Sequence, residues 1–132
     1  MNEEEALVRA FIVPSKRERV VGLLASPKRR KKFTSSLAHF GDLDPRWMIR
    51  IPPSEHFPPM LERLLRARGA GDSCYLVSED GELDGKRLPL GEALERVVGR
   101  GMGTLISCVP GELGVFEGEE ASDRCILARR AI

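Results

Sequence analysis

The sequence lacks the features that mark membrane and secreted proteins. No apolar run approaches the ~18–20 residues that a membrane-spanning helix needs. The acidic start Asn2-Glu3-Glu4-Glu5 does not resemble a signal peptide. The chain holds only 3 cysteines, which form no pairable disulfide framework. We therefore expect a soluble, reduced, cytoplasmic protein without membrane contact.

Sequence signatures of metal and nucleotide chemistry are missing as well. No CxxC, CxH or HxxxH pair is present to start a zinc site. The glycines of residues 99–103 follow a predicted helix and precede a predicted strand, the reverse of the order in a dinucleotide-binding fingerprint. The 4 carboxylates of residues 79–84 lack the spacing of a calcium loop, so turn formation explains them better. These absences predict no cofactor and no metal.

The cysteines and histidines still allow one catalytic arrangement. Cys74, Cys108 and Cys125 each fall in a predicted strand, while His39 and His56 lie near a helix end and in a proline-rich stretch. A Cys–His nucleophilic pair stays open, because such partners meet in space and not in sequence. We favour buried, inert thiols, since free cysteine usually behaves as a small hydrophobic residue. No residue is therefore assigned a catalytic role.

The chain does contain enough apolar material for one core. Of its 132 residues, 42% are apolar and 31% charged, which is typical of a folded domain and not of a disordered chain. No internal repeat or Ser/Gly-rich linker divides it. We predict a single domain over residues 1–132 with three parts. These are a basic helical segment (1–41), a proline-rich connector with a short helix (42–69) and an acidic segment (70–132).

Helix signals dominate the first 41 residues. A first helix should end at Pro14, because proline breaks a helix interior. Residues 15–18 form a capping-box sequence that predicts the start of a second helix. A third helix is expected to begin at Ser26-Pro27 and to end at Gly41.

Strand signals follow after residue 69. Predicted strands cover residues 74–77, 104–109, 113–117 and 124–130, and a helix over 90–98 lies between the first two. Residues 42–59, with two Pro-Pro pairs, are expected to be extended and poor in regular structure. The order strand-helix-strand-strand-strand predicts an α+β fold, in which a four-stranded mixed or antiparallel sheet packs with the N-terminal helices.

The strongest local signal is the basic run Lys28-Arg29-Arg30-Lys31-Lys32 in the third predicted helix. Cations near a helix N-terminus oppose the helix dipole and repel one another at i,i+3 and i,i+4. A bound anion would relieve both effects, because free backbone N–H groups and cations together make a phosphate site. A solvated face, or neutralisation by the protein's own acidic half, is the commoner origin of such a run.

Arg46, Trp47 and Arg50 are a second candidate contact for an anion or nucleic acid. Binding of single strands by stacking requires exposed aromatic side chains. The chain has 5 Phe, 1 Trp and 1 Tyr, and most of the Phe lie on predicted core faces. A lone tryptophan is more often half-buried than a stacking surface. Nucleic acid is therefore a less favoured partner.

Charge is divided unevenly along the chain. The formal net charge is +1, yet residues 1–68 hold 14 Lys and Arg against 8 Asp and Glu, and residues 69–132 hold 7 against 12. The halves can attract each other, within one chain or between subunits, or the basic half can meet an anionic protein. We predict a small non-catalytic binding or adaptor protein that uses its basic helix. The alternative is a small-molecule-binding or enzymatic domain with a pocket between sheet and connector.

Overall fold

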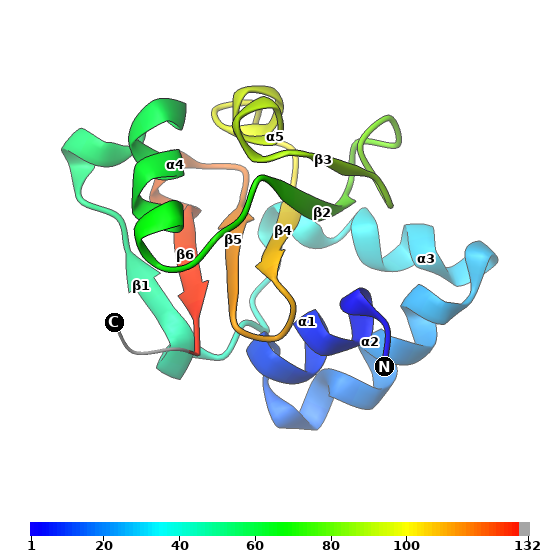
Figure 1. The fold of residues 1–132 in the computed structure, drawn as a ribbon. Helices are drawn as coiled ribbons and strands as arrows, with labels where there is room; N and C mark the ends of the chain where they lie inside the picture. Colours follow the sequence, from blue (N-terminus) through cyan, green and yellow to red (C-terminus); the bar gives the residue numbers. More distant parts are fainter. Residues whose placement is uncertain (130–132) are drawn as a thin grey trace.

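Six antiparallel strands form one sheet through the middle of the molecule (Figure 1). The structure is a computed structural model that describes residues 1–129. In this part of the chain the strand order is β1-β6-β5-β4-β2-β3. The strands are β1 (Met48–Arg50), β2 (Ser73–Ser78), β3 (Arg87–Pro89), β4 (Thr104–Val109), β5 (Leu113–Glu117) and β6 (Cys125–Ala128).

Three helices cover one face of the sheet. They are α1 (Glu3–Phe11), α2 (Arg17–Ala25) and α3 (Pro27–Thr34). Their apolar side chains form one buried cluster with the strand side chains that point to the same face. Phe11, Val20, Phe33, Leu105 and Phe116 belong to this cluster. In Figure 1 the three helices lie together at the lower right, so α3 stands at one end of the molecule.

Two helices cover the opposite face. They are α4 (Pro58–Ala67) and α5 (Leu90–Val97), and Leu61 and Leu94 belong to a second buried cluster that includes the strand residue Ile106. Successive side chains of a strand point to opposite faces, so Leu105 and Ile106 enter different clusters. The sheet is therefore the middle layer of three, and β5 is buried along its whole length.

The predicted α+β class is confirmed, whereas the predicted four-stranded sheet is wrong. The sheet has six strands in the described chain, because β1 and β3 were not expected. Each has only 3 residues and pairs on one side only, which leaves no alternation for a pattern to detect. The predicted strand order is also wrong, since β3 comes between β2 and α5.

The start of α2 differs from its prediction. The capping-box sequence at 15–18 does not open a helix, because Pro14–Lys16 form a 3₁₀ turn first. Lys16 is the N-cap of α2 and makes no side-chain cap. The turn keeps the chain close to α1, where the N–H of Val13 donates to the carbonyl of Asp42 at 2.9 Å.

The end of α3 differs as well. This helix begins after Ser26 as predicted, but it ends at Thr34 and not at Gly41, and residues 37–39 form a separate 3₁₀ turn. Lys31 and Lys32 therefore lie in its last turn, where the helix dipole favours cations. The longest α-helix among residues 1–129, α4, has 10 residues, and none of the helices there is long and apolar enough to cross a membrane.

Candidate functional site

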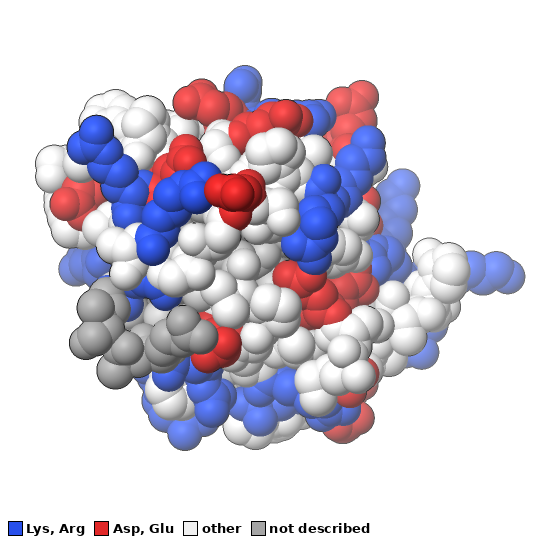
Figure 2. Space-filling model, viewed as in Figure 1, with Lys and Arg blue, Asp and Glu red and all other residues white. Residues whose placement is uncertain are grey.

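Most of the cations of α3 extend into solvent. Lys28, Arg29, Lys31 and Lys32 are exposed, and none of these four side chains forms an ion pair within residues 1–129. Figure 2 shows Lys and Arg side chains that reach outward at the right-hand end of the molecule, where Figure 1 places α3. Unpaired charges of one sign attract an approaching anion, so this end of the molecule is a candidate anion-binding surface.

A groove between α2 and the α3 region adds two more cations. The groove has a volume of about 360 Å³ and a floor of apolar side chains that includes Val20 and Phe33. Lys16 and Arg19 of the α2 region line it together with Lys32. Both are exposed and form no ion pair in the described part of the chain. The sequence analysis missed them because their place beside α3 depends on helix packing.

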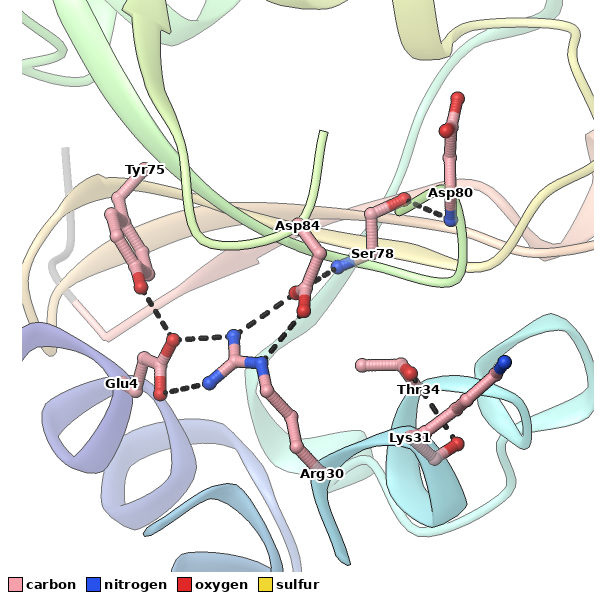
Figure 3. A network of polar contacts seen from close by, with 8 residues as sticks. All are labelled: Glu4, Arg30, Lys31, Thr34, Tyr75, Ser78, Asp80 and Asp84. Carbon is pink, nitrogen blue, oxygen red and sulfur yellow. Dashed lines mark hydrogen bonds and ion pairs between the residues drawn. The ribbon is translucent and has the colours of Figure 1, made fainter. Parts of the chain in front are cut away.

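Arg30 differs from its neighbours because it points into the protein (Figure 3). Its guanidinium donates to Glu4 of α1 (Nη1 to Oε1, 2.8 Å) and to Asp84 before β3 (Nε to Oδ2, 2.7 Å). The three side chains are only 14–21% exposed. The hydrogen bonds to Asp84 and Glu4 raise the pKa of Arg30 above its ordinary value. One cation of the run is thus neutralised by acidic residues of the same chain.

Further hydrogen bonds hold the two carboxylates that bind Arg30. The hydroxyl of Tyr75 donates to Glu4, and the N–H of Ser78 donates to Asp84 at 3.0 Å. Ordered donors on several sides fix the position of each carboxylate, so the network ties α1, α3 and the loop after β2 together.

Two of the other three carboxylates of residues 79–84 bind backbone groups. Asp80 accepts from the N–H of Glu82 at 2.9 Å, and Glu79 accepts from the N–H of Gly103 at 3.1 Å. Within residues 1–129, no three His, Cys, Asp or Glu side chains are placed to hold a metal ion. These acidic side chains therefore stabilise turns.

Arg46 and Trp47 lie near β1, at the opposite end of the sheet from α3 (Figure 1). Arg46 binds the buried Asp44 (Nη2 to Oδ2, 2.7 Å), and this contact lowers the pKa of the Asp44 carboxyl. The Trp47 ring is half-buried, with the guanidinium carbons of Arg46 and Arg129 at 5.4 and 4.1 Å from its centroid. The eight candidate residues therefore form two separate groups and not one patch.

Arg50 borders a hollow between the sheet and the proline-rich connector. The hollow has a volume of about 630 Å³. Its lining comes from the end of β1, from the connector that follows and from the 3₁₀ turn Ala121–Asp123 before β6. Arg50 is exposed and forms no ion pair within the described residues, so its guanidinium is available at the mouth.

A series of hydrogen-bonded polar side chains forms one wall of this hollow. Arg124 donates to Glu117 (Nε to Oε1, 2.5 Å) and to His56 (Nη1 to Nδ1, 2.8 Å). A guanidinium can only donate, so Nδ1 of His56 accepts and its Nε2 carries the hydrogen that is donated to the Ile51 carbonyl at 3.1 Å. Both ring nitrogens of His56 are therefore engaged in hydrogen bonds.

The three cysteines are buried and free. Burial raises the pKa of Cys74 and of Cys125 to about 12, and it raises the pKa of Cys108 above its usual range. His56 binds Arg124 and Ile51, while His39 lies 3.2 Å from Glu119, so neither imidazole is recorded against a thiol in the described chain. The arrangement gives no support to a Cys–His pair.

Comparison of this chain with protein-family models, with curated proteins and with solved structures found no match. The fold and the site define a three-layer α+β molecule with a cationic surface at α2 and α3 and a hollow beside β1.

Sequence reasoning missed the chain of contacts from Glu117 through Arg124 to His56. One signal was present: Glu117 and Arg124 flank two apolar strand runs with only a short turn between them. Charged residues beside strands that are buried on both faces must be paired. That rule could have predicted the pair of Glu117 and Arg124. His56 lies 68 residues from Arg124 in the sequence, so its contact with Arg124 could be found only from the fold.

Proposed function

We propose that this protein is a non-catalytic binding or adaptor protein that contacts an acidic surface of another protein. The contact surface, called the basic surface below, comprises Lys16, Arg19, Lys28, Arg29, Lys31 and Lys32. One observation carries the proposal. All six side chains are exposed, and none forms an ion pair within residues 1–129.

An acidic protein fits the basic surface better than nucleic acid does. Stacking of bases requires an exposed aromatic ring. Phe33 is buried, and Phe40 packs edge-on against it with 5.5 Å between ring centroids. Trp47 is half-buried against the cluster under α1, α2 and α3, and the guanidinium carbon of Arg129 lies 4.1 Å from its ring centroid. Contacts of the basic surface with nucleic acid would therefore be limited to phosphates and would carry no sequence preference.

A labelled polyglutamate peptide tests the proposal in a salt series. The variant Arg29→Gln/Lys31→Gln/Lys32→Gln removes three cations and leaves Arg30 in its network. Exposed ion pairs contribute about 0.2–1 kcal/mol each, so we expect about tenfold weaker binding at low salt. Added salt should weaken wild-type binding, because it screens exposed charges.

The matched control is Arg63→Gln/Lys86→Gln/Arg100→Gln. It removes the same charge from three exposed side chains that have no ion pair in the described chain. Equal weakening by both variants, or no binding of the peptide, would contradict the proposal. Binding of RNA at physiological salt, with a slope of log K against log salt of about −0.7 per phosphate contact, would instead identify a nucleic-acid surface.

A further inference from the structure

We propose that the hollow between the connector and the turn Ala121–Asp123 binds a small organic carboxylate with an apolar body. The site lies at the β1 end of the sheet and is independent of the basic surface. Its anionic group would bind Arg50 and its apolar body would fill the hollow.

The size of the hollow suits a small molecule. Its volume of about 630 Å³ falls in the range of roughly 300–1,000 Å³ that is usual for small-molecule sites. Ile51, Pro53 and Ala121 supply aliphatic walls, and His56 adds an aromatic ring whose nitrogens are both engaged. These groups would bury apolar atoms of a ligand without leaving its polar groups unpaired.

The charges around the hollow favour one anionic group. Arg124 is 6% exposed and its charge is balanced by Glu117, which is 2% exposed. Arg50 has no such partner among the described residues. Asp123, the acidic residue of the turn, is not among the residues that line this hollow, and it accepts from the N–H of Glu120 at 3.1 Å. Among the residues that line the hollow, Arg50 is therefore the one charge without a counter-charge.

A carboxylate is the anion that this geometry suits. The planar guanidinium of arginine binds a carboxylate through two parallel hydrogen bonds. Ser122 is an exposed residue of the same lining, and we expect its hydroxyl to donate a third. The wall behind is already ordered, because Arg124 is held by Glu117 and His56. Binding would need little rearrangement of the protein.

Phenylbutyrate is a suitable probe, with its uncharged amide as the control ligand. Titration into the isotopically labelled protein, followed by amide chemical shifts, should give saturable changes at Ile51, His56 and Ser122. The amide should bind about tenfold more weakly, because it loses the charge-assisted hydrogen bonds to Arg50. Inorganic phosphate, which lacks an apolar body, should cause no saturable change there.

Two variants locate the ligand within the hollow. Arg50→Gln should weaken phenylbutyrate binding about tenfold, while the matched exposed variant Arg100→Gln should leave it unchanged. Ala121→Trp should abolish binding, since Ala121 lines this hollow and its replacement fills it. Equal binding of acid and amide, unchanged binding by Arg50→Gln or Ala121→Trp, or the absence of saturable shifts would each overturn the proposal.

Discussion

Tyr75 shows how strongly one side chain depends on its place between layers. It is the only tyrosine of the chain, and its hydroxyl donates to Glu4 in a partly buried setting. Burial, and then the hydrogen bond to Glu4, raise the pKa of Tyr75 to about 12. A phenol with a raised folded pKa contributes stability that is complete below its ordinary pKa of about 10. That stability is lost as the pH rises through 12.

We therefore expect the phenolate absorbance of the folded protein to develop with a midpoint near 12. The unfolded protein should titrate near the ordinary value of about 10. The folded protein loses stability between pH values of about 10 and about 12, because Tyr75 ionises more readily when unfolded. Tyr75→Phe should abolish this part of the pH dependence. A folded-state midpoint at the ordinary value would show that Tyr75 is in contact with water and not with Glu4.

At the scale of single residues, the sequence predicted contacts that form within one turn. The Asn2 side chain caps α1, Pro27 is the first residue of α3, and Gly69 and Gly99 have positive φ just after α4 and α5. It did not predict that Arg30 alone turns inward. The partner Asp84 lies 54 residues further along the chain, beyond the reach of any local rule.

At the scale of elements, the cations of α3 differ in their surroundings. Arg30 fastens the helix to α1 and to the loop after β2, while its four exposed cations remain available to a partner. The positive run is therefore tolerated for two reasons. One charge is neutralised, and Lys31 and Lys32 lie where the helix dipole favours them.

Arg30→Gln should lower the free energy of unfolding by about 2 kcal/mol, between the values for exposed and fully buried ion pairs. The loss arises because Glu4 and Asp84 would remain close together without a cation. Urea unfolding measures it. Lys28→Gln, which removes an exposed cation of the same helix, should change the free energy by less than about 0.5 kcal/mol. Equal effects of the two variants would contradict the internal role of Arg30.

The long central elements were predictable and the edge strands were not. β4 and β5 match their predicted ranges because both faces of each are buried, which produces a continuous apolar run. β1 and β3 are strands only because β6 and β2 lie beside them. The hollow at Arg50 is bounded by β1, one of these edge strands. The sequence therefore predicted the proline-rich connector beside the hollow but not the set of residues that line it.

At the scale of the whole molecule, the three layers depend on each other. The helical segment of residues 1–41 covers Val77, Leu105, Phe116 and Leu127 on one face of the sheet. Without that segment, these side chains would form a contiguous exposed apolar surface.

A fragment of residues 42–132 should therefore be insoluble or should lack a cooperative thermal transition. Circular dichroism during heating, with the full chain as control, measures this. The fragment lacks both the basic side chains and the helices that bury one face of the sheet. The full chain carrying Arg29→Gln/Lys31→Gln/Lys32→Gln loses only three of these charges, so it should melt cooperatively. A soluble fragment with a sharp transition would show that the helical segment is a separate module.

The pairing of β1 with β6 also determines when the molecule can be completed during synthesis. Met48 of β1 lies opposite Leu127 of β6, which is 79 residues further along the chain. A ribosome releases the N-terminal end first. The apolar faces of α1, α2 and α3 therefore emerge before the strands that cover them exist, and β1 has no partner until β6 has been made. The sheet therefore stays incomplete until Ala128, the last residue of β6, has been synthesised.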